Sequence, residues 1–338
     1  MRPRLEDVAA HAGLSAKTVS RVLNNEPNVR ESTRRRVAVS IEALDYLPNP
    51  SARSLAANRS FIVALLYDNP SPSYVMEVQT GVLQVCDSYS YGMMAQPIDS
   101  SSADLVSRVA KLISSRRPDG LVLTPPITEH PGVIAELRTR DIPFTCISPR
   151  EPDTFSGVAL DETAASCDMV EHLVSLGHTS IAHIIGHPRH GGSELRLKGY
   201  AEGLARSGLL YRESLVLQGQ FSYQSGVECA HRFLIAENRP TAIFAANDDM
   251  AAGVISTALE MGLRIPDDLS VCGFDDTPIS RQVWPSITTI HQPCLDMGRI
   301  AATELFKIIH HNVKANMVLA NYSLCVRAST GKPSTSGR

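Results

Sequence analysis

The 338-residue sequence has no long apolar run and no clustered cysteines. No stretch of about 18 apolar residues occurs, and the first residues, MRPRLEDVAAHAG, contain no apolar signal core, so we expect neither a membrane span nor secretion. The seven cysteines are scattered without a CxxC pair or a histidine cluster. We therefore expect buried thiols in a reducing cytoplasm, and neither disulfides, a metal site nor a cofactor.

Motifs of the common enzyme classes are also missing. The sequence contains no nucleophile motif, no phosphate-binding P-loop and no metal-ligand spacing. Asp275 and Asp276 are a conceivable pair of catalytic carboxylates. Four histidines are conceivable general bases: His178, His187, His190 and His291. Because no second catalytic element accompanies them, we expect no catalytic residues and no enzyme. His190 with the two glycines after it is interpreted as a flexible loop at the mouth of a ligand-binding cleft.

Charge is divided unevenly along the chain. Residues 1–60 hold ten Lys and Arg against six Asp and Glu, a net charge of +4, whereas the other 278 residues carry a net charge of −7. A basic segment on a larger acidic body is typical of a nucleic-acid-binding head. Because 338 residues exceed what one hydrophobic core usually supports, we expect two or three domains.

Residues 5–25 predict two short helices around a turn at Gly13. The first helix has an apolar face at helical spacing: Leu5, Val8, Ala9 and Ala12. Ser15 is a good N-cap for the second helix, whose buried stripe is Val19, Val22 and Leu23. In a helix-turn-helix the second helix enters the major groove, so Lys17 and Arg21 are candidate donors to guanine. The alternative is a helical hairpin with a solvated basic face.

Residues 32–45 predict a third helix that closes the core of the head. Its apolar residues are Val37, Ile41 and Leu44, and its first turns carry Arg34, Arg35 and Arg36. Pro48 and Pro50 end this helix, and residues 51–58 can form a short helix that is marginal by itself. This segment is either a plain linker or a hinge helix that folds on DNA and inserts Leu55 into the minor groove.

Seven motifs follow one another in a set order: DVAAHAGLSAKTVSRVLN, TRRRV, ALDYLPNPSARSLA, LVSLGH, AANDDMA, GFDDTP and TTI. In this order they resemble the LacI/GalR family of transcriptional regulators, and the resemblance covers nearly the whole chain. It implies a homodimer that binds a pseudo-palindromic double-stranded DNA operator. It further implies that a small molecule in the large domain controls the affinity for DNA.

The resemblance also implies which residues contact DNA. The base readers are Ala16, Lys17 and Arg21, and the phosphate contacts are Ser15, Thr18, Ser20, Asn24 and Thr33. Ala52 and Leu55 are expected in the minor groove. The chain departs from many relatives at Ala16, where some carry a larger reader, and at Arg30, where many carry a serine that can cap the third helix. The operator sequence can therefore not be transferred.

From Phe61 onward, apolar runs of strand length alternate with helical stretches. The runs are residues 62–66, 121–123, 142–147, 181–185, 242–246 and 269–274. Such alternation predicts parallel sheets covered on both faces, and it occurs twice. We expect a helix-turn-helix domain (1–47), a hinge (48–60) and a two-lobed, periplasmic-binding-protein-like α/β domain. Its first lobe comprises about residues 61–157 with 291–326, its second lobe about 158–290, and residues 329–338 form a disordered tail.

Polar side chains follow the predicted strands, where parallel sheets bind ligands. Those at strand ends are Asp68, Asn69, Asn247, Asp248, Asp275 and Asp276; each has helix capping as an alternative, and Asp248 is the strongest cap candidate. Gln292 lies on the crossover between the lobes. The family resemblance adds Arg196, which can fork onto vicinal oxygens, and Phe221, which can stack on a sugar ring. The expected effector site is Asp68, Asn69, Arg196, Phe221, Asn247, Asp275 and Gln292.

These observations predict a sequence-specific repressor whose operator affinity depends on a small molecule that biases closure of the lobes. A sugar or oligosaccharide that releases DNA is favoured over a purine-like corepressor that tightens binding. A periplasmic binding protein would share the two lobes, but it would need a signal peptide and would carry no basic head.

Overall fold

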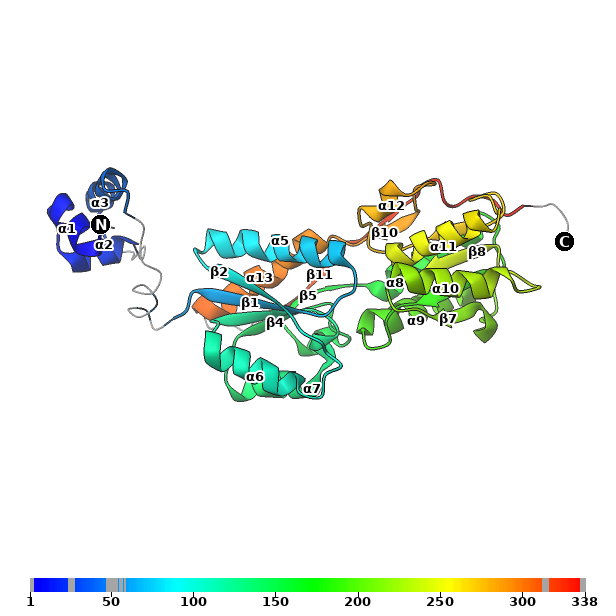
Figure 1. The fold of residues 1–338 in the computed structure, drawn as a ribbon, viewed down its shortest axis with the longest axis horizontal. Coiled ribbons are helices and arrows are strands. Elements are labelled where there is room, and N and C mark those ends of the chain that lie inside the picture. Colours follow the sequence, from blue (N-terminus) through cyan, green and yellow to red (C-terminus); the bar gives the residue numbers. More distant parts are fainter. Residues whose placement is uncertain are drawn as a thin grey trace. The chain divides into compact units, whose positions relative to one another are not determined.

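The computed structural model describes residues 3–23, 28–46, 54, 57, 59–311 and 316–334. The chain divides after Ser60 into two compact units, each described by itself below. The described residues of the smaller unit, called the head, include the helices α1 (Leu5–Ala12), α2 (Ala16–Leu23) and α3 (Glu31–Ala43), all blue in Figure 1. Their apolar faces meet around Val8, Val19 and Val37, which are fully buried.

The turn between α1 and α2 follows the prediction from the sequence. Gly13 ends α1 with a φ of 61°, the left-handed conformation that glycine adopts without strain. At the start of α2, Ser15 Oγ accepts a hydrogen bond from the Thr18 amide at 3.2 Å. The predicted glycine turn and serine cap are therefore confirmed. Arg30 stands at the N-cap of α3 and makes no side-chain capping bond there.

The larger unit has two parallel sheets, as predicted (Figure 1). The first lobe is a six-stranded sheet in the order β11-β5-β4-β3-β1-β2. Its strands are β1 (Ile62–Tyr67), β2 (Gly92–Pro97), β3 (Gly120–Leu123), β4 (Phe144–Ile147), β5 (Gly157–Leu160) and β11 (Met317–Ala320). One face is covered by α5 (Pro72–Ser88) and α13 (Cys294–His311), the other by α6 (Leu105–Arg116) and α7 (Pro131–Thr139).

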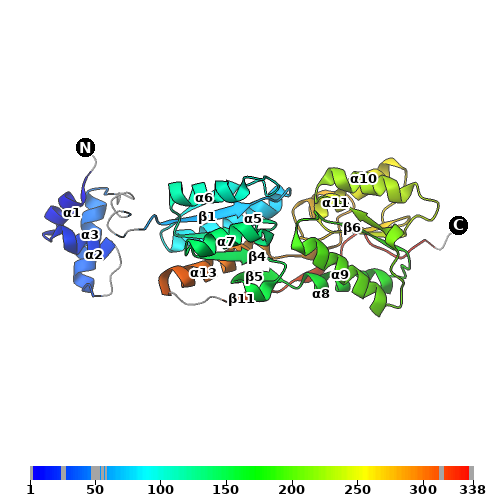
Figure 2. The ribbon, with the colours of Figure 1, turned by 90° about the horizontal axis from the view of Figure 1, so that it is seen from below.

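The second lobe is a four-stranded sheet in the order β7-β6-β8-β9. Its strands are β6 (Ile181–Ile185), β7 (Val216–Gln218), β8 (Ala242–Ala245) and β9 (Ser270–Cys272). Figure 2 shows α8 (Glu162–Ser175) and α9 (Gly191–Arg206) on one side of it, and α10 (Tyr223–Leu234) and α11 (Asp248–Glu260) on the other. A short helix, α12 (Ile279–Gln282), follows β9, and β10 (Thr289–His291) pairs antiparallel with β12 (Ser323–Cys325).

Two boundaries expected from the sequence are wrong. Residues 158–160 belong to the first lobe, because they form β5 between β4 and β11. The tail expected to be disordered is ordered at its start: Ser329 is fully buried and its carbonyl accepts a hydrogen bond from the Val271 amide at 2.9 Å. The polar composition of this segment predicts a solvated tail. In the structure, however, the hydroxyl group of Ser329 is hydrogen bonded to the Val271 carbonyl of β9 and to the Thr288 amide. Residues 335–338 lie outside the described part.

Candidate functional site

On the head, α2 presents the polar face expected of a DNA-reading helix. Lys17 is exposed, and Arg21, four residues later on the same face, is half-buried. Ala16 is partly buried against the core of the head, so it faces outward less than the sequence predicts. This face can carry two cationic donors into a groove of DNA.

The expected phosphate contacts gather at helix starts. Ser15 Oγ and Thr18 Oγ1 lie 2.8 Å apart at the N-terminus of α2, and Thr33 is half-buried in the first turn of α3. Helix N-termini attract phosphate through their free amides. Ser20 is half-buried on α2. Three further expected contacts, Asn24, Ala52 and Leu55, lie outside the described residues.

The arginines of α3 do not act alike. The Arg36 guanidinium donates from Nη2 to the Ala12 carbonyl at 2.5 Å and thereby caps the C-terminus of α1. Arg35 makes an exposed ion pair with Glu31, with 3.4 Å between Nε and Oε1. Arg36 is thus a structural residue of the head, which its place among three adjacent arginines of a basic segment did not predict.

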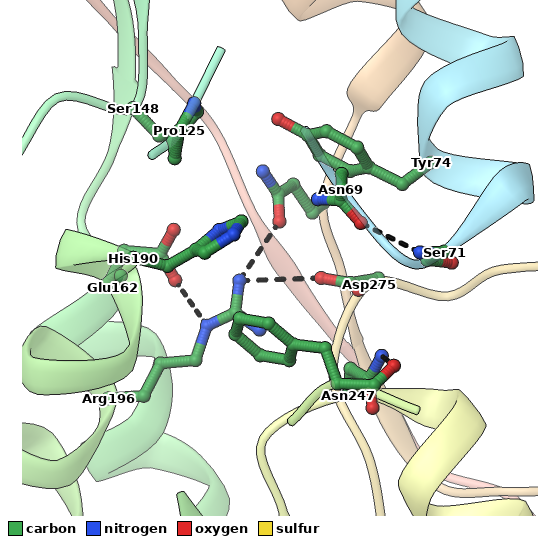
Figure 3. Close-up of a pocket in the computed structure, with 13 residues that line it drawn as sticks. Asn69, Ser71, Tyr74, Pro125, Ser148, Glu162, His190, Arg196, Asn247 and Asp275 are labelled. Atoms are coloured by element: carbon green, nitrogen blue, oxygen red, sulfur yellow. Dashed lines mark hydrogen bonds and ion pairs between the residues drawn. The ribbon is translucent and has the colours of Figure 1, made fainter. Parts of the chain in front are cut away.

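In the larger unit, residues from both lobes line one pocket, called the interlobe pocket (Figure 3). Six of the seven residues expected at the effector site line it: Asn69, Arg196, Phe221, Asn247, Asp275 and Gln292. The seventh, Asp68, does not, and its Oδ2 instead accepts a hydrogen bond from the Ser100 amide at 2.8 Å. The pocket lining also includes Ser71, Tyr74, Pro125, Ser148, Glu162, His190 and Gly192.

Arg196 is the centre of this pocket. Its Nε donates to Glu162 at 2.7 Å, its Nη1 to the Ala246 carbonyl, and its Nη2 to Asp275 at 3.4 Å and to Gln292 at 3.3 Å. The guanidinium also lies over the Phe274 ring, with Cζ 3.6 Å from the ring centre. Burial opposes the charge of Arg196, but the carboxylates of Glu162 and Asp275 raise its pKa. All three guanidinium nitrogens of Arg196 thus donate hydrogen bonds to protein groups.

Three pocket residues have a left-handed backbone: Ser148 (φ 44°), Phe221 (φ 58°) and Asp275 (φ 104°). Such conformations are strained for residues with a side chain, and they concentrate at functional sites. Burial also raises the pKa of Asp275 well above its usual value. Strain and an unusual carboxylate therefore coincide at one pocket, as expected of a binding site.

The asparagine and aspartates at the ends of β8 and β9 have separate roles. Asn247, not Asp248, caps α11, because its Oδ1 accepts from the Met250 amide at 3.0 Å. The predicted cap Asp248 is fully buried inside the second lobe, and its carboxylate accepts hydrogen bonds from Thr277 and Thr289. Asp276 binds the guanidinium groups of Arg281 at 2.6 Å and of Arg327 at 2.5 Å. Asp248 and Asp276 therefore stabilise the fold.

Contacts between the lobes close the pocket. Ser71 Oγ in the first lobe donates to Asp249 Oδ2 in the second at 2.8 Å, and Arg150 Nη1 pairs with Glu194 Oε2 at 3.2 Å. The enclosed volume is about 40 Å³, room for about three waters. In this arrangement the free space in the pocket is small for a sugar-sized molecule.

Several lining residues escaped the sequence analysis. Glu162 follows β5, a strand that was not predicted, and no sequence signal distinguishes Tyr74. Ser148 directly follows the predicted strand 142–147, so its position at a strand end could have identified it. His190 was interpreted as part of a flexible loop, but it is buried and directly precedes α9. Helix α9 begins with the two glycines that suggested a loop.

Within the described residues, no group of three or more His, Cys, Asp and Glu side chains is placed to hold a metal ion. The described helices also include none that is long and apolar enough to cross a membrane.

Comparison with known proteins agrees with this architecture. A model described as "Bacterial regulatory proteins, lacI family" matches residues 4–49, and one for a "Periplasmic binding protein-like domain" matches residues 170–330. Catabolite control protein A of Priestia megaterium is 32% identical over 334 residues, which cover 98% of this chain and 100% of that protein. The chain belongs to the LacI family of transcriptional regulators.

Further LacI-family proteins match over most of their length. The transcriptional repressor PurR of Photobacterium profundum is 30% identical, over 96% of this chain and 98% of that protein. The lac repressor dimer bound to operator and the anti-inducer ONPF has a TM-score of 0.81 at 27% identity, with 98% of this chain and 100% of that chain covered. The CelR–cellobiose complex has a TM-score of 0.73 at 28% identity, covering 97% and 100%. This LacI-family chain is a DNA-binding regulator and not an enzyme.

Proposed function

We propose that this LacI-family regulator is a repressor that binds a sugar or oligosaccharide in the interlobe pocket and releases its operator in response. The observation that carries this proposal is the convergence of six expected effector residues on one pocket between two lobes. The Phe221 ring lines this pocket together with the amide side chains of Asn69 and Gln292. An aromatic face beside polar groups suits a pyranose, which has apolar C–H faces and hydroxyl edges. The similar CelR structure is described as a cellobiose complex.

The control of DNA binding follows from lobe closure. A ligand shifts an equilibrium only if it binds the two states with different affinity. The interlobe pocket is lined by residues of both lobes, so a sugar bound there contacts both of them and biases lobe closure, which the Ser71–Asp249 and Arg150–Glu194 contacts also affect. We infer that this change alters the spacing of two heads on adjacent half-sites, which lie about ten base pairs apart in DNA bound by helix-turn-helix dimers.

The test has two steps. Sequences selected by the full-length protein from a random DNA pool give the operator. Fluorescence anisotropy of that operator is then measured with neutral sugars, disaccharides and purines. We expect a sugar to weaken operator binding at least tenfold, or 1.4 kcal/mol. A purine that tightens binding would instead identify a corepressor, and no effect of any compound would contradict the proposal.

We further propose that the repressor is a homodimer and that α5 and the α12 region form its interface in the larger unit. Large apolar side chains are exposed on both: Met76 and Leu83 of α5, and Trp284, 82% exposed, just after α12. Both helices lie along the upper edge of this unit in Figure 1. Exposed apolar patches of this kind mark protein interfaces. Sedimentation of Leu83→Glu and Trp284→Glu should show monomers, whereas Leu210→Glu, at an exposed leucine of the second lobe outside the proposed interface, should leave a dimer.

A further inference from the structure

A second cavity lies on the first lobe, between α7 and the segment that follows β4. It measures about 520 Å³, against about 40 Å³ for the interlobe pocket, and this volume is within the range of roughly 300–1,000 Å³ that small-molecule sites have. All ten residues that line it lie within residues 128–155, and none of them lines the interlobe pocket. This cavity, called the α7 groove, is therefore a separate candidate site.

Helix α7 turns one face toward the groove. Four of its residues line the groove at helical spacing: Pro131, Ile134, Ala135 and Arg138. Phe155 lines it from the segment after β4. Pro131 and Arg138 are seven positions apart, which is about 10 Å along a helix axis. Ile134 is buried, and Phe155 is half-buried against the core of the first lobe. The groove thus has an apolar floor that is long enough for an aromatic ring with a short side chain.

The end of the groove at the start of α7 is acidic. Its cation, Arg150, pairs with Glu129, with 3.9 Å between Nε and Oε2, and with Glu194 of the second lobe, with 3.2 Å between Nη1 and Oε2. Burial raises the pKa of Glu129, and the nearby charge of Glu151 adds to this effect. This end of the groove thus carries more carboxylates than cations, and it disfavours an anion.

Arg138 lies at the other end of the groove. Its guanidinium is over the Phe155 ring, with 5.8 Å between Cζ and the ring centre. Arg138 is exposed, and among the described residues no carboxylate pairs with it, whereas Arg140 on the same helix pairs with Glu136 at 2.6 Å. A guanidinium held over an aromatic ring keeps N–H donors in a plane that matches the two oxygens of a carboxylate. Arg138 can therefore anchor an acidic guest.

We propose that the α7 groove binds an amphipathic monocarboxylate, that Arg138 anchors its carboxylate, and that Ile134 and Phe155 contact its aromatic or alkyl body. The groove suits one negative charge, because the carboxylates at the start of α7 repel a second one. A phosphate or a sugar acid has no apolar body for the floor, and a neutral amphiphile leaves the Arg138 guanidinium without a partner. The inference goes beyond the proposed sugar response, because it concerns another site and another class of molecule.

Isothermal titration calorimetry on the full-length protein tests the ligand class. The probes are phenylacetate and hexanoate, each compared with its primary amide, which keeps the apolar body and lacks the charge. We expect at least one acid to bind and its amide to bind more than tenfold more weakly, because the amide cannot form the charge-assisted pair with Arg138. Equal or tighter binding of the amide, or binding by neither acid, would overturn the inference.

Two arginines of the α7 region form a matched pair of variants for the anchor. Arg138→Gln should weaken binding of the acid at least tenfold, whereas Arg140→Gln, which removes an arginine paired with Glu136 outside the groove, should leave it unchanged. Both arginines are exposed, so both variants should keep the Tm of the wild type within a few degrees. Equal affinities of the two variants for the acid would refute the assignment of Arg138.

Two phenylalanines locate the bound acid. Phe155→Leu removes the aromatic face from the α7 groove, and Phe221→Leu removes the one in the interlobe pocket. We expect only Phe155→Leu to weaken the acid, by about three- to tenfold. A loss in Phe221→Leu alone would place the acid in the interlobe pocket and contradict the site. Ala135→Trp, at an exposed position of the groove, should block binding and gives a second test if Phe155→Leu does not fold.

Discussion

Ser71 and Asp249, 178 positions apart in the chain, join the two lobes through a hydrogen bond of 2.8 Å between Oγ and Oδ2. The bond is charge-assisted when Asp249 is ionised, and bonds of this kind contribute about 1.5–3 kcal/mol. Ser71 itself is buried, and it lines the pocket that the lobes enclose. The closed arrangement of the lobes therefore depends on a contact that a single substitution removes.

We predict that Ser71→Ala shifts the lobes toward the open arrangement. Spin labels placed on α6 and α10 would report the distance between the lobes by electron paramagnetic resonance. The variant should show a larger population at long distances than the wild type. Ser101→Ala is the control, because Ser101 bonds Asp99 within the first lobe and should leave the distances unchanged. Identical distributions in wild type and Ser71→Ala would show that this contact does not hold the lobes together.

Arg21 should discriminate between DNA sequences. We expect Arg21→Ala to weaken operator binding by about 1–3 kcal/mol while changing the affinity for random DNA far less, because a base contact is lost. Arg35→Ala, which removes an exposed cation paired with Glu31, should lower both affinities by the same small factor. Anisotropy titrations at one salt concentration make the comparison. Equal losses for Arg21→Ala on both DNAs would assign Arg21 to phosphate contacts.

Arg36 should instead matter for the stability of the head. Removal of its guanidinium leaves the Ala12 carbonyl without its donor, and we expect a loss of about 1.5–3 kcal/mol. Hydrogen exchange of the amides in α1 and α2 reports this directly in the full-length protein. Exchange should accelerate in Arg36→Ala and stay unchanged in Arg35→Ala. If the two variants exchange alike, the cap on α1 contributes nothing measurable.

Asp248 should make the stability of the larger unit depend on pH. Burial raises the pKa of Asp248 from 3.8 to about 7, so the folded protein keeps a proton that the unfolded chain releases. The contribution of this carboxyl group to the free energy of unfolding is therefore full below pH 3.8 and falls as the pH rises toward about 7. Urea unfolding at pH 5 and 7.5 should show the wild type losing stability relative to Asp248→Asn between the two values. A constant difference between the proteins would contradict an elevated pKa.

Much of the architecture could be predicted because local signals are strong where one face of an element is buried. The apolar spacing around Val8 and Val19, with Gly13 and Ser15 between them, determines the head. The convergence of Asn247 and Asp275 on one pocket was accessible for a related reason, since the carboxyl ends of the parallel strands β8 and β9 meet at one edge of their sheet.

The remaining features depend on contacts between distant segments. From the sequence Arg36 has the character of a surface residue, and only the folded structure places the C-terminus of α1 beside its guanidinium group. Ser329 lies in a polar segment, and only the folded structure shows its hydrogen bond to β9. Residues 158–160 were placed in the wrong lobe because nothing in this short apolar run shows which of two similar sheets it joins. Asp248 and Asn247 are adjacent cap candidates, and only the direction of the backbone decides between them.

The last residues of the chain also decide when the molecule can fold during synthesis. The first lobe needs α13 and β11, and the second needs Ser329 beside β9, so neither lobe can be completed before these segments have been translated. The described core of the head, in contrast, involves no residue after Tyr46. A ribosome that stalls late in the message would therefore release a polypeptide with a complete head and two unfinished lobes, which exposes apolar surface to chaperones and proteases.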